Sequence, residues 1–354
     1  MEKGSANLDR IRGLDSIRFI CALWVLFGHF AAPPLTDGID LGSRLGYLIG
    51  GISSRTFTGT PAVIIFFIIS GFCIHYPYSK SNGPLKLGEF YTRRFVRILI
   101  PVMVAVPISR IVDVRLSLFE ESVLWSLVAE LVYYCLYPLL RLTARGSSWR
   151  TLVIISFVGA FSVALTNPTA LRYPSYGSEL NWALGLPCWL LGCVLAESIR
   201  AGVRPTVSRL SIWGWRAVLY GAAMVCITLR FHTPIGFPWT LNLFALVAVP
   251  WLSREIEYYR THPPSHILEW AGLWSYSLYL MHMPAKPFFD ALQLPNLGYF
   301  FNWAILCLFV LAFCYVFYLL VERPSHEVAR RAANFYRNLR QTKMTDEVRA
   351  QTTN

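Results

Sequence analysis

Arg18 and His29 are the residues whose types and spacing most favour chemistry, because they lie eleven positions apart in one apolar stretch, residues 14–33. In a helix eleven residues make about three turns, so both side chains would lie on one face, about 16 Å apart along the axis. A charged side chain within a membrane span is costly unless it faces a polar interior. We therefore expect Arg18 and His29 to face a ligand that extends into the bilayer.

Glu130 and His282 are two further polar residues within apolar segments, at an expected depth similar to that of His29. A histidine that accepts a proton and a carboxylate that orients it are suited to general base catalysis. Each residue alone could instead make a structural polar contact between helices. We predict that His29, Glu130 and His282 are catalytic residues in the outer half of the bilayer.

Arg94 and Arg97 open another apolar segment, at its cytoplasmic end, and their spacing of three places them on one helical face. Arginine side chains match the geometry of phosphate groups. A basic cluster that only fixes membrane orientation is the alternative. Because Arg18 is expected near the same depth, we favour an anionic ligand held by Arg18, Arg94 and Arg97.

The composition is that of a membrane protein. Of the 354 residues 55% are hydrophobic and 15% are charged, and the mean hydropathy is +0.45. Soluble domains carry about 25% charged residues. The net charge of +12 would suit nucleic acid, but the basic residues lie in short segments between apolar runs, so we expect no nucleic-acid partner. The cysteines and histidines do not have the spacing of a metal site, and no metal is expected.

Ten apolar segments are compatible with membrane-spanning helices, although several are shorter than usual. Most of the 32 Lys and Arg residues lie in alternate inter-segment loops, on the same side as both chain ends. The positive-inside rule then places both ends in the cytoplasm. The prediction is an all-α polytopic protein, with a cytoplasmic segment 1–13, a membrane domain 14–324 and a cytoplasmic basic tail 325–354. The segments cover residues 14–33, 57–77, 95–112, 123–142, 151–167, 181–199, 215–231, 236–252, 268–287 and 299–321.

Short motifs along residues 14–324 resemble, in order, those of the membrane acyltransferase-3 family. Each motif is short, but together and in this order they are quite specific. The matching residues are Arg18 and His29 in an Arg-x10-His pattern, Ser70-Gly71-Phe72, Arg94-Phe-Val-Arg97, Trp125-Ser126-Leu127 with Glu130 and Tyr133 to Pro138, Ser275 to His282 with Pro284, and Glu322-Arg323-Pro324.

The resemblance implies an integral membrane enzyme that moves an acyl group, often acetyl, from cytoplasmic acyl-coenzyme A to a hydroxyl. The acceptor would be a sugar of a surface polysaccharide or a glycolipid, and the setting the inner (cytoplasmic) membrane. It implies that Arg18, Arg94 and Arg97 hold the coenzyme A phosphates. His29 would be the base, or would carry the acyl group itself, with Glu130 and His282 orienting the base or the acceptor. Assembly into a homo-oligomer is left open.

A transporter or flippase for an acylated glycan or lipid is the main alternative, since it would also have many spans and polar residues at depth. A transporter built from inverted repeats should show paired interrupted helices in its two halves. The sequence shows no such pairing. A scaffold or receptor without chemistry would explain the span count but not the placement of Arg18 with His29.

Overall fold

The computed structural model describes residues 11–30, 32–36, 39–40, 42–79, 83–116, 124–335 and 337. Its regular structure within these residues is helical, which confirms the all-α prediction. Short 3₁₀-helical turns follow α3 (Tyr76–Tyr78) and precede α7 (Tyr173–Tyr176), and a π-helical stretch (Tyr318–Glu322) continues α12. The α-helices are α1 (Leu14–His29), α2 (Arg44–Thr56), α3 (Thr60–His75), α4 (Leu87–Ile111), α5 (Trp125–Gly146), α6 (Trp149–Thr166), α7 (Gly177–Arg200), α8 (Arg209–His232), α9 (Phe237–Thr261), α10 (His266–Gly272), α11 (Ser275–Asp290) and α12 (Tyr299–Phe317).

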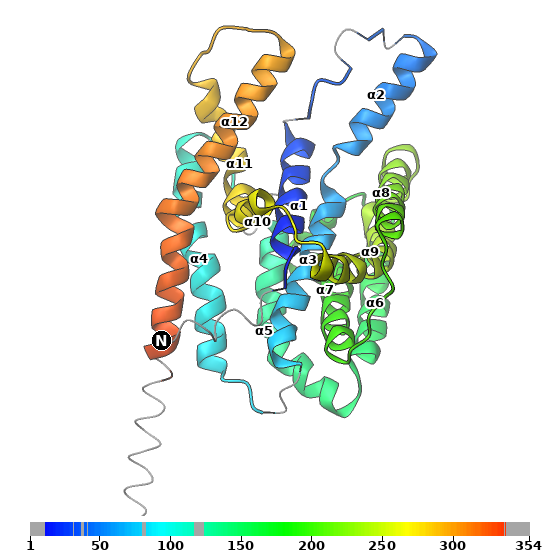
Figure 1. Cartoon of the computed structure of the whole chain (residues 1–354), viewed down its shortest axis with the longest axis vertical. Helices are drawn as coiled ribbons and strands as arrows, with labels where there is room; N and C mark the ends of the chain where they lie inside the picture. The colour runs from blue at the N-terminus through cyan, green and yellow to red at the C-terminus, as the bar shows by residue number, and fades with distance from the viewer. Residues whose placement is uncertain are drawn as a thin grey trace, which may run out of the picture.

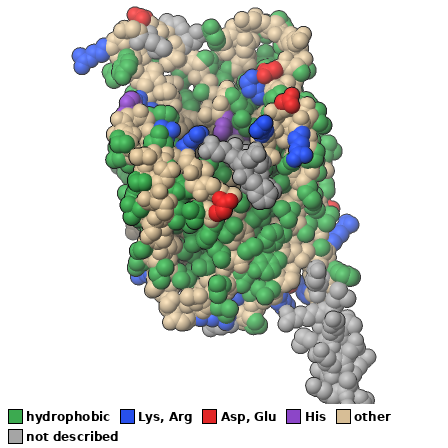
Figure 2. Space-filling view, turned by 180° about the vertical axis from the view of Figure 1, so that it is seen from behind, with side chains coloured by type: hydrophobic (Ala, Val, Ile, Leu, Met, Phe, Trp, Pro, Cys, Tyr) green, Lys and Arg blue, Asp and Glu red, His purple; other side chains and the backbone are tan. Residues whose placement is uncertain are grey.

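Six helical stretches within the described residues are long and apolar enough to cross a membrane. Hydrophobic side chains cover the middle of the face in Figure 2, while Lys and Arg lie mainly toward its upper part and lower edge. Both features are typical of a multi-pass membrane protein. The span count of ten and the cytoplasmic position of both ends remain predictions. The six stretches are Arg44–Tyr78, Trp125–Gly146, Trp149–Thr166, Tyr173–Arg200, Arg209–His232 and Tyr299–Phe335.

Helix α3 lies in the middle of the bundle, with α11 and α12 on one side of it and α6 and α8 on the other (Figure 1). Its sequence is apolar around the whole circumference, and most of its residues are buried. A helix that is hydrophobic all round needs lipid or neighbouring helices to cover it, and neighbouring helices bury most of α3. This central position lets α3 contribute residues to cavities at both ends of its length.

Two glycines allow the backbones of α3 and α7 to approach closely. A Cβ atom at Gly71 would lie 1.9 Å from the carbonyl oxygen of Trp189, and one at Gly192 would lie 2.1 Å from that of Ile68. Neither carbonyl can move away without shifting its helix. The two helices are therefore fixed against each other by main-chain contact.

Replacing Gly71 by alanine should lower the thermal unfolding midpoint in detergent, because overpacking against rigid backbone costs about 1–3 kcal/mol. Gly159 on α6 is the matched control, since a Cβ there would meet no atom within 4 Å. Gly159→Ala should leave the midpoint unchanged or raise it slightly. Equal midpoints for the two variants would contradict the close helix contact.

The structure differs from the sequence prediction in three elements. The sequence pattern predicts a loop where the structure has α2, because glycines and serines lower the hydropathy of this segment. Four apolar side chains of α2 are exposed. The predicted segment 268–287 is two helices, which break at Leu273 and Trp274. The last helix continues beyond Pro324 to Phe335, because small buried residues extend its packing face after the apolar segment ends. These are the exposed residues of α2, Leu45, Tyr47, Leu48 and Ile52, and the small buried residues Ala329 and Ala333.

Candidate functional site

Two adjoining cavities in the helix bundle share Val63 of α3 and Tyr279 of α11 as lining residues. We call the first the arginine cavity; it has about 990 Å³ of empty volume and is lined by Arg18, Arg94 and Arg97. We call the second the histidine cavity; it has about 1300 Å³ and is lined by His29, Trp125 and Arg115 among others. The two residues of the Arg-x10-His pattern on α1 are thus divided between two adjoining spaces.

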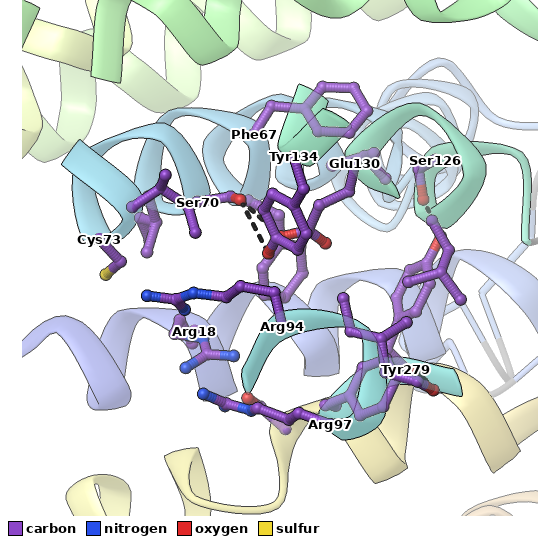
Figure 3. A pocket seen from close by; sticks show the side chains of 18 residues that line it. Arg18, Phe67, Ser70, Cys73, Arg94, Arg97, Ser126, Glu130, Tyr134 and Tyr279 are labelled. Carbon is purple, nitrogen blue, oxygen red and sulfur yellow. Dashed lines mark hydrogen bonds between the residues drawn. The ribbon is translucent and has the colours of Figure 1, made fainter. Parts of the chain in front are cut away.

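The three arginines gather at one end of the arginine cavity (Figure 3). Arg18 comes from α1, whereas Arg94 and Arg97 come from α4 about one helical turn apart. The Arg18 side chain is 26% exposed and lies 3.6 Å from the carboxylate of Asp15. Arg94 and Arg97 form no hydrogen bond or ion pair with any described residue. Half-buried guanidinium groups without a full set of counterions favour an anionic ligand.

Glu130 also lines the arginine cavity, where its carboxylate is held by two hydroxyl groups. Ser70 Oγ donates to Glu130 Oε1 at 2.5 Å, and the Tyr134 hydroxyl donates to the same oxygen. The indole of Trp189 donates to Ser70 Oγ at 3.2 Å. This network joins α3, α5 and α7 and fixes the carboxylate toward the cavity.

The sequence predicts that Glu130 lies with His29 and His282. In the structure Glu130 lines the arginine cavity, whereas His29 lines the histidine cavity. Among the described residues, Glu130 has hydrogen bonds with Ser70 and Tyr134 and none with a histidine. The depth of a residue along its helix does not specify the rotation of that helix, so it does not tell which cavity Glu130 of α5 faces. From the sequence Ser70 is a small packing residue, and Tyr134 stands out only as one position of the Tyr133 to Pro138 stretch that resembles the family motif. The i,i+4 spacing of Glu130 and Tyr134 on one helical face is the signal that could have linked them.

His29 and His282 form a pair, with ring centroids 5.1 Å apart and planes inclined by 44°. Nδ1 of His282 lies 2.8 Å from the Tyr279 carbonyl oxygen and 3.1 Å from that of Leu278. Because carbonyl oxygens only accept, Nδ1 must carry the proton, and Nε2 of neutral His282 carries a lone pair. Nε2 is buried without a hydrogen-bond partner among the described residues. It is therefore available to accept an N–H group beside His29.

The histidine cavity combines exposed arginines with aromatic rings. Arg115 and Arg172 lie on its wall, and Trp125 packs edge-on against Tyr173 with ring centroids 5.4 Å apart. In the sequence the two arginines are only loop charges, because nothing local links positions so far apart. Within the part of the chain that the structure describes, no cluster of three or more His, Cys, Asp or Glu could hold a metal ion.

Comparisons with known proteins cover nearly the whole chain. The sequence model of a protein family described as "Acyltransferase domain" matches residues 11–319, which include every helix that lines the two cavities. The chain is also similar to acyltransferase MdmB of Streptomyces mycarofaciens. The two are 22% identical over 335 residues, covering 83% of this chain and 84% of that protein. No solved structure matches the chain.

Proposed function

The chain belongs to this acyltransferase-3 family, and from that premise we propose that it transfers an acetyl group from acetyl-coenzyme A to a hydroxyl of a carbohydrate or glycolipid acceptor. The observation that carries the proposal is the contact between the two cavities. Three guanidinium groups line one of them, a histidine lines the other, and Val63 and Tyr279 border both. A donor and an acceptor bound in separate spaces could meet at this border.

On the donor side, Arg18, Arg94 and Arg97 bind phosphate groups of coenzyme A. Guanidinium groups donate paired hydrogen bonds that fit phosphate oxygens, and such charged bonds are stronger than neutral ones. Glu130 lies in the same cavity, so we assign it a positioning role on this side. Its carboxylate accepts two hydroxyl groups already and retains lone pairs for an amide N–H of the pantetheine arm.

From its place in the histidine cavity, His29 acts as general base on an acceptor hydroxyl at the border of the two cavities. It removes the proton from the acceptor hydroxyl, and the oxygen forms a bond to the thioester carbonyl carbon. The carbon–sulfur bond then breaks, and the thiolate of coenzyme A takes the proton back from His29. During turnover the free Nε2 of His282 would accept an N–H of the neighbouring His29, which would orient the base and stabilise its protonated form.

On the acceptor side, the lining of the histidine cavity supports a carbohydrate. Trp125 and Tyr173 offer aromatic surface for the apolar face of a sugar ring, while Thr58, Thr60 and Arg115 offer polar groups for its hydroxyls. We place the protein in the inner (cytoplasmic) membrane as a multi-pass enzyme. Lipid, acyl-coenzyme A and the acceptor are then its partners.

Membrane vesicles with and without the protein, supplied with acetyl-coenzyme A, test this function. We expect release of free coenzyme A thiol, together with an added acetyl mass on glycans or glycolipids of the vesicles. Thiol release is read by a chromogenic disulfide and the acceptor by mass spectrometry. Intact acetyl-coenzyme A and unchanged acceptor masses would instead favour a transporter or flippase.

A further inference from the structure

Tyr279 and Ser126 form a hydrogen-bonded pair at the end of the arginine cavity opposite the guanidinium groups (Figure 3). The Tyr279 hydroxyl lies 2.6 Å from Ser126 Oγ, which joins α11 to α5. Tyr279 also borders the histidine cavity. The pair therefore stands where the two cavities meet.

The position of Tyr279 is fixed from three directions. Its hydroxyl is held by Ser126, and its ring packs edge-on against Phe66 at a centroid distance of 6.1 Å. Its carbonyl oxygen accepts the Nδ1 proton of His282 at 2.8 Å. Val63 of α3 is the other residue that borders both cavities. These contacts restrict the movement of the Tyr279 side chain, and the hydrogen bond from His282 fixes the position of Tyr279 relative to the histidine pair.

We propose that Tyr279 and Ser126 form a gate that selects the length of the transferred acyl group. This inference rests on the proposed function. With the coenzyme A phosphates at the arginines, the thioester must reach the gate to meet an oxygen activated by His29. The acyl chain then lies against Val63, Phe66 and Tyr279. A short acyl group fits beside this wall, and a longer one collides with it.

The expected discrimination is large because the side chains of Val63, Phe66 and Tyr279 line this end of the cavity and Tyr279 is held in place by Ser126. Each methylene that such a pocket excludes changes kcat/KM by about tenfold or more. We expect the unaltered protein to prefer acetyl- over hexanoyl-coenzyme A by at least about 100-fold. Replacing Tyr279 by a smaller residue should reduce this preference by raising kcat/KM for hexanoyl-coenzyme A.

The experiment measures kcat/KM with acetyl-, butyryl- and hexanoyl-coenzyme A for the full-length protein in vesicles. Tyr279→Ala should lower the acetyl-to-hexanoyl ratio by at least about tenfold. Tyr279→Phe keeps the ring volume and should keep most of the discrimination. Ile69→Ala is the matched control, because Ile69 lines the arginine cavity but does not border the histidine cavity.

Val63→Ala provides an independent variant, since it widens the same border from α3 if Tyr279→Ala fails to fold. A lower ratio in Tyr279→Ala or Val63→Ala, with an unchanged ratio in Ile69→Ala, supports the gate. An unaltered protein that uses hexanoyl-coenzyme A as well as acetyl-coenzyme A overturns it, as does an equal change in Ile69→Ala. A protein that transfers no acyl group from any of the three thioesters contradicts the proposed function itself, which is a different outcome.

Discussion

Replacing His29 by alanine should lower the rate of acyl transfer by about 10²–10⁴-fold, the usual contribution of a positioned general base. The loss should fall on kcat, because His29 lies in the histidine cavity, away from the three arginines that we assign to the donor. The KM for acetyl-coenzyme A should stay close to that of the unaltered protein. Steady-state kinetics of thiol release in vesicles provides both constants.

His266→Ala is the control for His29→Ala, because His266 begins α10 and is exposed outside both cavities. It should retain full activity. His282→Ala should cause a smaller loss than His29→Ala, since it removes the group that orients the base but leaves the base. Normal turnover by a correctly inserted His29→Ala protein would remove His29 from the mechanism.

Replacing Arg94 and Arg97 together by glutamine should raise the KM for acetyl-coenzyme A by at least about tenfold for each charged hydrogen bond to phosphate that is removed. Hydrogen bonds to charged groups contribute about 1.5–3 kcal/mol each, which corresponds to this change in affinity. Arg94→Lys should recover only part of the affinity, because lysine keeps the charge but not the paired donors. Titration calorimetry with coenzyme A measures the same effect without turnover.

Arg93 is the matched control for this pair. It lies on the same helix and carries the same charge, but it is 47% exposed and pairs with Glu89 at 2.6 Å instead of lining the cavity. Arg93→Gln should therefore leave the KM unchanged. If the double variant and Arg93→Gln had the same KM, the arginines would serve membrane orientation rather than donor binding.

Local patterns in the sequence are sufficient to predict much of the helical framework. Long apolar runs correspond to α3, α5, α7 and α12, because burial in lipid or between helices demands them. Helix α2 is not predicted, because glycine and serine residues between its apolar residues lower the mean hydropathy of the segment. The spacing of Arg18 and His29 predicts a polar site beside both, but it cannot reveal that they line separate cavities.

The detailed site depends on contacts between helices that are distant in the sequence. Ser70 and Glu130 are 60 residues apart, and their hydrogen bond exists only because α3 and α5 pack in one particular rotation. The pairing of His29 with His282 has the same origin. A single sequence contains no local signal for such rotations, so the helices could be predicted but the partners of their side chains could not.

The glycine contact between α3 and α7 has a mechanical consequence. Alternating-access transporters work by rocking one group of helices against another. With Gly71 and Gly192 each set against the main chain of the neighbouring helix, α3 has no room to slide past α7. The two helices should therefore move as one unit, so any change of shape during turnover must take place at other helix contacts.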